Sequence, residues 1–351
     1  MLKFITDEKN QRFIVPLVSV FLGFIAGAII MMITGINPIE GYRALIKGVV
    51  GNPRRFGEWI VASTPLILSG LAIAFGLRTG VFNIGVEGQL IAGSFAAAAV
   101  GILIELPRFI HLPMVMLAAA IAGALWGLIP GFLKAKFKVH EVVVGIMLNY
   151  TALHLVNYAI KILPGSTNTK TVDIFESANL SSKFLSSITK HSRLHWGFII
   201  AFLGALIFWY IIERTTFGYE LRSVGFNPHA SEYAGMKVER NIVYSMMISG
   251  AFAGLAGAMI SVGTFNYARV IGGFEGYGLD GIAVALLGNN GGLGILISGF
   301  LFGALKAGSS AMALAKVPKE IAEIIMAFIV LFAAMNYGIK RLILYLRKEE
   351  K

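Results

Sequence analysis

Nine apolar runs, each about 20 residues long, recur along this chain from one end to the other. A helix needs about 20 predominantly apolar residues to cross a bilayer core of ~30 Å, so each run predicts a membrane-spanning helix. The runs occupy residues 13–34, 59–77, 89–106, 112–133, 142–163, 196–212, 242–262, 295–315 and 321–337. A weaker, glycine-broken run at residues 279–287 makes a tenth if it crosses or re-enters the membrane.

The composition agrees with an integral membrane protein. Hydrophobic residues make up 56% of the 351 residues and charged residues 14%, whereas a soluble domain carries about 25% charged residues. The lengths of the runs exclude an outer-membrane barrel, whose strands are about 10 residues long with alternating polarity. We therefore predict an all-α polytopic membrane protein, with residues 1–351 forming one transmembrane domain. Because cysteine is absent, disulfides, thiolate metal sites and cysteine nucleophiles are excluded.

Basic residues lie mostly in short segments between the runs. The net charge of +11 is therefore interpreted as a topology signal rather than as a nucleic-acid-binding surface, since cytoplasmic loops are enriched in Lys and Arg. This rule predicts a cytoplasmic location for residues 1–12, for the loop at 134–138, for residues 213–241 and for the basic tail at 338–351. The exceptions are Arg43, Lys47, Arg54 and Arg55, which fall on the outside. A helix start at Asn37-Pro38 predicts that this segment lies on the membrane surface.

Two polar segments separate spanning helices. Residues 164–195 are rich in Ser, Thr, Asn and Lys and predict an external loop, either a solvated connection or a docking surface for an external partner. Residues 213–241 contain a short predicted helix at 229–234, with Asn227 as its cap, Pro228 in the first turn and Gly235 as its left-handed end. That helix either anchors the segment at the membrane surface or receives force from a soluble partner.

Glycines at four-residue spacing predict close contacts between helices. The pairs indicate one compact bundle rather than a string of separate spans; they are Gly23 and Gly27, Gly123, Gly127 and Gly131, Gly250 and Gly254, and Gly299 and Gly303.

One helix carries a polar stripe. Within residues 142–163, polar residues recur at steps of three and four and share one face; they are Tyr150, His154, Asn157, Tyr158 and Lys161. Polar residues are costly inside a bilayer and mark pathways. We expect this face to line a polar cavity for a ring-containing polar solute, although Lys161 alone would extend to the interface and His154 alone would be a satisfied buried histidine.

The polar stretch 79–89 lies between two of the most apolar runs. Its glycines predict a break in the helix, and broken backbone at membrane depth is tolerated only where protein buries it or where it lines a cavity. Phe82, Asn83, Glu87 and Gln89 therefore either contact solute or satisfy the freed backbone groups. Paired breaks in the two halves of a chain point to a transporter's central site. The second break comprises residues 272–280 and 288–294, with Asp280, Asn289 and Asn290 as candidates.

These stretches carry a family resemblance. Phe82-Asn-Ile-Gly-Val-Glu-Gly-Gln89, the segment 288–294, and Thr216 to Pro228 with Ala234-Gly235 resemble the permease subunits of type II ATP-binding-cassette importers. The full Asn-Ile-Gly-x-Glu-Gly-Gln motif is more similar to that of nucleoside-uptake permeases than to that of permeases for ribose or branched-chain amino acids. The resemblance runs from about Pro38 to the C-terminus and includes all three motifs in order.

The resemblance implies a fold of about ten helices with broken or re-entrant segments, in the cell membrane. It implies an ATPase subunit that receives residues 216–235, a second and nonidentical permease, and a surface-tethered lipoprotein that delivers nucleoside. The residues implied in ATPase coupling are Arg222, Gly225, Asn227, Pro228 and Gly235. This chain is expected to bind no cofactor and to be no enzyme, because ATP and magnesium belong to the ATPase and the sequence contains no G-x-x-x-x-G-K-[ST] loop.

Three alternatives remain open at this point. An ion-coupled secondary transporter fits the broken helices and buried carboxylates equally well, and an importer permease for a sugar such as ribose fits the family. A membrane-embedded enzyme is disfavoured, because neither H-E-x-x-H nor G-x-S-x-G occurs.

Overall fold

The structure, a computed structural model, describes residues 8–335 and residue 338. Most of the predicted N-terminal segment 1–12 and of the basic tail 338–351, together with the end of the run 321–337, lies outside the described residues. The helices are α2 (Glu8–Ile33), α3 (Pro38–Val50), α4 (Pro53–Arg78), α5 (Val86–Leu103), α6 (Arg108–Phe137), α7 (Glu141–Ile162), α8 (Lys183–Ile188), α9 (Gly197–Arg214), α10 (Thr216–Phe226), α11 (Pro228–Tyr233), α12 (Val238–Ala258), α13 (Tyr277–Leu287), α14 (Gly292–Leu314) and α15 (Glu320–Ala334). A 3₁₀ turn, η1 (Glu176–Ala178), and a π-helical turn, η2 (Met259–Phe265), complete them.

Each apolar run coincides with a helix, which confirms the predicted class. Eight helices within the described residues are long and apolar enough to cross a membrane. The weak tenth run is α13, whose 11 residues extend about 16 Å, roughly half of a bilayer core. A helix of this length starts or stops within the membrane, so its ends must find polar partners inside the protein.

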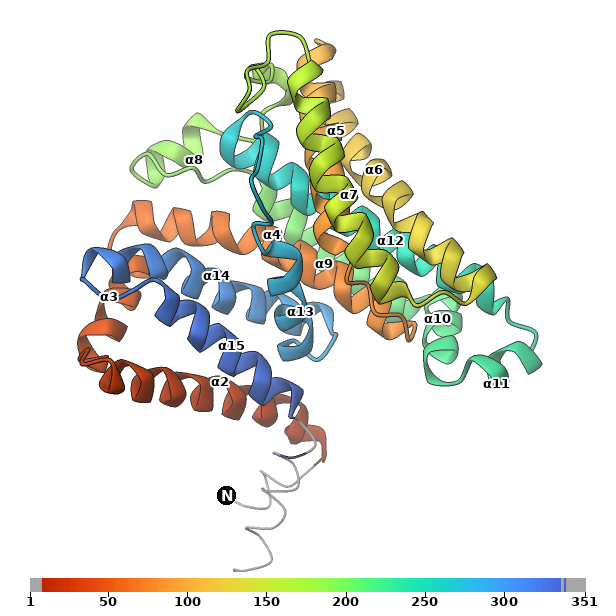
Figure 1. Ribbon diagram of the computed structural model, residues 1–351, viewed down its shortest axis with the longest axis horizontal. Coiled ribbons are helices and arrows are strands. Elements are labelled where there is room, and N and C mark those ends of the chain that lie inside the picture. The colour runs from red at the N-terminus through yellow and green to blue at the C-terminus, as the bar shows by residue number, and fades with distance from the viewer. Residues whose placement is uncertain (1–7, 336–337, 339–351) are drawn as a thin grey trace, which may run out of the picture.

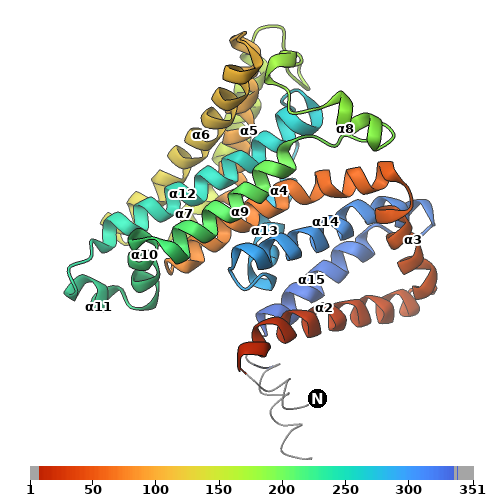
Figure 2. The same cartoon turned by 180° about the vertical axis from the view of Figure 1, so that it is seen from behind.

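The helices form two groups joined by α4 (Figure 1). One group contains α5, α6, α7 and α12, and the other contains α2, α3, α14 and α15. Helix α4 is the most deeply buried span and packs against α12, α13 and α14. In the reverse view, α9 lies along it (Figure 2). Most buried apolar side chains form one cluster that reaches from α2 to α15, and Val61, Leu185 and Leu194 form a second, small cluster.

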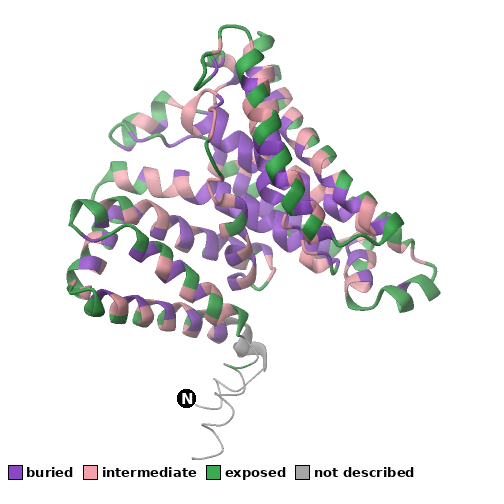
Figure 3. Cartoon of the chain, viewed as in Figure 1, coloured by how far each residue is buried: buried purple, intermediate pink, exposed green. Residues whose placement is uncertain are grey.

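Exposed residues lie along the outer faces of the bundle (Figure 3), and many of them are large and apolar. The predicted surface helix is α3, and Asn37 caps it by accepting the Ile39 N–H at 3.0 Å. It buries Leu45 and Val49 against its neighbours and exposes Ile39. Lipid-facing apolar residues of this kind need no polar partner in a membrane.

The predicted glycine contacts occur at three crossings, of α6 with α12, of α2 with α15 and of α14 with α4. Gly123 lies against Gly250 and Gly254, and a Cβ atom at Gly254 would collide with the carbonyl oxygen of Ala119. Because lipid provides no hydrophobic drive for helices to associate, close backbone approach supplies much of the packing energy.

We predict that Gly254→Val separates α6 from α12. Overpacking costs roughly 3 kcal/mol at a site with no slack, so the thermal unfolding midpoint in mild detergent should fall and folded yield should drop. Gly273→Val is the control, since a Cβ atom at Gly273 would meet nothing within 4 Å. Equal midpoints for the two variants would contradict the predicted role of this contact.

Candidate functional site

The break between α4 and α5 is held by a buried pair of side-chain amides. Helix α4 ends at Arg78, and Gly80 takes a left-handed φ of 74°. Asn83 donates from Nδ2 to Gln89 Oε1 at 2.9 Å and to Ser249 Oγ of α12 at 2.7 Å. Gln89 donates back to Asn83 Oδ1 at 3.2 Å. Asn83 Oδ1 also accepts the Gly85 N–H at 3.0 Å. Both amides are fully enclosed, so Asn83 holds the backbone of the break and Gln89 holds Asn83.

A third amide, Asn149 of α7, completes the break and is absent from the residues chosen from the sequence. Its Oδ1 accepts the Gly88 N–H at 2.8 Å, and its Nδ2 donates to the Ile84 carbonyl at 3.0 Å. An asparagine inside the apolar run 142–163 was the available signal, because buried amides in spanning helices require partners. Its partners, however, come from a distant part of the chain.

Glu87 joins the first break to the second. Its carboxylate accepts the Gly276 N–H at 3.0 Å and the Gly278 N–H at 2.5 Å, which are donors at the start of α13 that no helical partner satisfies. Glu87 is only 2% exposed. The adjoining cavity, of about 40 Å³, has room for ordered water but not for a ring-containing solute. In this conformation Glu87 is a helix cap supplied by a different helix.

Two ion pairs lie next to this capped end. Asp280, in the first turn of α13, pairs with Lys306 of α14 at 2.8 Å, and Arg269 pairs with Glu275. Lys306 also lies 3.8 Å from the centre of the Tyr277 ring. Lys306 interrupts the apolar run 295–315, a signal that the choice of residues from sequence did not use.

The polar stripe of α7 lies on the outer surface of this chain rather than inside it (Figure 3). Tyr150, His154, Tyr158 and Lys161 are exposed there. Asn157 differs from them: its side chain donates to the Ile271 carbonyl at 2.7 Å and accepts the Ile271 N–H at 3.0 Å. Within a single chain the stripe is therefore an open face.

Phe82 lies beside α7 at the same break. Its backbone N–H donates to Glu141 of α7 at 3.4 Å, and Glu141 pairs with Lys134 of α6 at 2.6 Å. This contact places Phe82 near the α6–α7 connection and leaves its half-buried ring out of the amide cluster.

The short helix predicted after Asn227 is α11. Asn227 accepts the Ala230 N–H at 3.1 Å, Pro228 occupies the first turn, and Gly235 follows with a φ of 84°. Helices α10 and α11 project from the bundle beyond the ends of α9 and α12 (Figures 1 and 2). Their exposed side chains include Phe226 at 91% and Tyr233 at 96%.

The C-terminal end of α10 touches the first break, and Arg78 links this region to the second. Gly225 packs so tightly on the first break that a Cβ atom there would lie 2.5 Å from the Arg78 carbonyl oxygen. Glu213 bridges Arg78 at 2.9 Å and Arg222 at 2.7 Å. Arg78 also donates to the Asn290 carbonyl at 3.0 Å. The stretches 79–89, 216–235 and 288–294, which are far apart in sequence, therefore meet in one region.

Asn289 and Asn290 form the tight turn between α13 and α14. Both adopt left-handed φ values, 51° and 53°, a conformation that asparagine tolerates better than most residues. This backbone requirement accounts for the two asparagines in the turn.

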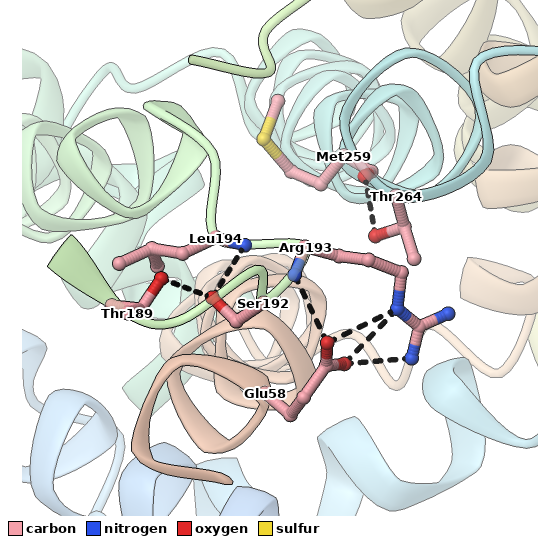
Figure 4. A network of polar contacts seen from close by, with 7 residues as sticks. All are labelled: Glu58, Thr189, Ser192, Arg193, Leu194, Met259 and Thr264. Atoms are coloured by element: carbon pink, nitrogen blue, oxygen red, sulfur yellow. Dashed lines mark hydrogen bonds and ion pairs between the residues drawn. The ribbon is translucent and has the colours of Figure 1, made fainter. Parts of the chain in front are cut away.

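At the opposite end of the bundle, residues 164–195 fold over η2 and the loop that follows it. Backbone hydrogen bonds of 2.8 to 3.1 Å join the two segments, from Thr171 to Ala268, Ile174 to Asn266, Leu180 to Val262 and Val270 to Thr169. Arg193 binds Glu58 of α4 through its guanidinium and its backbone N–H, next to a Thr189–Ser192 hydroxyl pair (Figure 4).

His195 closes this region in a neutral form. Its Nδ1 accepts the Gly197 N–H at 3.1 Å, and burial lowers the pKa of the imidazole to about 4. A histidine held neutral across physiological pH acts here as a packing residue against Gly263.

The sequence is similar to those of several known transporter permeases. The chain is 53% identical to a guanosine ABC transporter permease protein of Bacillus subtilis, over 97% of this chain and 99% of that protein. It is 36% identical to a nucleoside ABC transporter permease protein of Lactococcus lactis, over 95% and 94% respectively. A glucose ABC transporter permease protein of Haloferax volcanii is 30% identical over 93% and 88%. No solved structure matches the chain.

A family model also matches most of the chain. It is described as branched-chain amino acid transport system / permease component, and it covers residues 56–334, which include both breaks and the segment 216–235. These relatives are permease components rather than enzymes or ion-coupled carriers. The chain therefore belongs to the family of branched-chain amino acid transport system permease components, as its motifs predicted.

Proposed function

We propose that this chain is one transmembrane subunit of an ATP-driven importer of nucleosides. The observation that carries the proposal is 53% identity over almost the whole chain to a guanosine permease. The second relative, a nucleoside permease, supports the same substrate class. The glucose permease is the more distant of the three at 30% identity, so a sugar is the second candidate.

A second permease is proposed to cover the exposed stripe of α7. Tyr150, His154 and Lys161 face outward, and ionisable groups turned toward lipid are costly. A partner that covers them would convert the open face into a pathway. Bacillus subtilis has two different guanosine permeases that resemble this chain, and Lactococcus lactis has two different nucleoside permeases that do so. These pairs support a nonidentical partner.

The ATPase is proposed to bind at α10 and α11. Phe226 and Tyr233 are almost fully exposed there, and exposed aromatic side chains are typical anchors of protein interfaces. Because the chain contains no phosphate-binding loop, ATP and magnesium are assigned to that separate subunit. This assignment makes the α11 end cytoplasmic, in agreement with its basic residues.

The segment 164–195 lies at the opposite end of the bundle from α11 (Figure 1). In the proposed orientation it faces outward and receives the substrate-binding lipoprotein. Its hydrogen bonds to residues 262–270 connect that surface to the loop leading into α13.

The direct test is reconstitution. The chain, affinity-tagged in its native cells and extracted in mild detergent, should copurify with an ATPase and a different permease. In proteoliposomes with the binding lipoprotein, this complex should take up radiolabelled guanosine only with ATP, and glucose should not compete. Uptake driven by a proton or sodium gradient without an ATPase would establish an ion-coupled carrier instead, and transport of glucose alone would establish the sugar importer.

We predict that two variants separate attachment of the ATPase from transmission of its movement. Tyr233→Ala removes an interface anchor and should weaken copurification of the ATPase roughly 30-fold, the effect of losing about 2 kcal/mol. Gly225→Val should leave the ATPase bound and hydrolysing ATP but reduce nucleoside uptake, because it forces α10 away from the first break.

Phe184→Ala is the control for this pair, since Phe184 is an exposed aromatic residue of α8 at the other end of the bundle. It should leave copurification unchanged. Full coupling of hydrolysis to uptake in Gly225→Val would exclude α10 as the transmitting element.

We also predict that Glu87→Gln slows uptake of purine and pyrimidine nucleosides by the same factor. A glutamine oxygen replaces only one of the two acceptors, which leaves a buried N–H of α13 without a partner at a cost of about 1–3 kcal/mol. The thermal midpoint should fall, whereas it should not change in Glu105→Gln, an exposed control. A change in preference between nucleosides would assign Glu87 to solute contact, and normal uptake would remove the carboxylate from any required role.

A further inference from the structure

A cavity of about 540 Å³ opens between α13, α14 and α15. It adjoins the start of α13 that Glu87 caps, since Gly276 contributes to its lining. Its volume falls within the range of small-molecule sites, about 300–1,000 Å³. Its walls combine apolar side chains, such as Leu279, Met326 and Val330, with the polar groups of Asp280 and Lys306. Mostly apolar walls with a few placed polar groups are typical of ligand sites.

The polar wall lies within the length of a spanning helix. Lys306 is about 20 Å along α14 from Gly292, measured at the helical rise per residue, and a bilayer core is ~30 Å thick. A charged pair at this depth is costly unless it serves a pathway or a fixed partner. Asp280 and Lys306 are each 27% exposed, so both are reachable from the cavity while paired.

The charge of the lining restricts the solute. Glu275, Asp280 and Glu323 contribute three carboxylates, and Lys306 contributes one ammonium group. Arg269, outside the lining, pairs with Glu275, so the carboxylates outnumber the cations by one. A phosphate dianion would meet an excess of negative charge. Hydroxyl groups of a neutral solute, by contrast, donate to carboxylates, as the ribose hydroxyls of dinucleotides do, and they accept from lysine.

An aromatic wall connects the cavity to α7. Phe274 lines the cavity and meets Tyr150 edge to face, with ring centroids 5.0 Å apart. The cavity therefore adjoins the exposed stripe on α7 that forms the proposed pathway. A flat nucleobase gains from stacking on such a ring.

We propose that this cavity is an intermediate binding site for a neutral ribonucleoside along the transport pathway. Asp280 and Lys306 contact the sugar hydroxyls, and Phe274 contacts the base. This inference rests on the proposed function as a nucleoside importer. It adds Lys306 and Phe274 as specificity-determining residues and excludes nucleotides as substrates of the site.

A purely structural role for the ion pair is the competing explanation. Asp280 and Lys306 hold α13 against α14, and removal of one partner from a buried pair is destabilising by itself. Exchange of the two charges separates the roles, because Asp280→Lys combined with Lys306→Asp restores the pair but moves each hydrogen-bonding group. A structural pair tolerates the exchange, whereas a solute contact does not.

The experiment uses the complete transporter in proteoliposomes, with tritiated guanosine and tritiated 2′-deoxyguanosine as probes. The same binding lipoprotein serves every variant, so a change in the ratio of the two uptake rates belongs to the permease. Asp280→Asn and Lys306→Gln should each lower the ratio of guanosine uptake to 2′-deoxyguanosine uptake about tenfold. This is the effect of losing one hydrogen bond to a charged group. The control is Glu40→Gln, which removes an exposed carboxylate from α3 and should preserve the ratio.

The charge exchange should restore the thermal midpoint without restoring uptake, and guanosine 5′-monophosphate should not compete with the wild-type complex. Phe274→Leu, a change in a partly exposed loop residue, should lower uptake about tenfold while ATP hydrolysis stimulated by the binding lipoprotein continues. The proposed nucleoside site would be wrong if the variant with Asp280→Lys and Lys306→Asp kept the wild-type uptake rate and an unchanged ratio. It would also be wrong if Asp280→Asn and Lys306→Gln left the ratio unaltered. Absence of nucleoside uptake by the wild-type complex would instead reject the proposed function, and this site with it.

Discussion

Backbone groups freed by broken helices must find partners inside the protein, because lipid supplies none. That constraint accounts for the polar side chains at the two breaks. Asn83 and Gln89 bind one another across the first break, and Asn149 binds the backbone on both sides of Gly85. Glu87 extends from the start of α5 to the start of α13. The short helix α13 has its place in the bundle because this carboxylate replaces the missing turn before it.

The sequence predicted local features well and distant pairings poorly. Apolar run length located the spanning helices, glycines located both breaks, and Asn227 with Pro228 located α11, because each signal lies within the element that it specifies. The α7 stripe was expected to line a cavity, yet within one chain it is an open outer face. Asn157 shares the spacing of that stripe but binds the Ile271 backbone. Such partners depend on how the bundle closes, which helical periodicity does not encode.

Two connections from opposite ends of the bundle converge on Glu87. From the α11 end, Gly225 and Arg78 bring α10 against the break that begins α5. From the other end, residues 164–195 are hydrogen-bonded to the loop that leads through Glu275 and Gly276 into α13. Glu87 bonds the start of one helix to the start of the other. In the proposed importer, signals from the ATPase and from the binding lipoprotein would therefore meet at one side chain.

The hydrogen bonds between Glu87 and the start of α13 restrict which helices can move separately in the proposed transport cycle. Each charge-assisted bond from Glu87 contributes about 1.5–3 kcal/mol, and the glycine contacts around Gly80 and Gly225 leave no compressible gap. A movement of α10 is then transmitted at lower cost if α5 and the start of α13 shift together than if the cap breaks. If α5 and α13 shift together, the contacts between α13 and α15 must change. The cavity with Asp280 and Lys306 lies between these two helices. A solute held there would experience each shift as a change in the width of its own site.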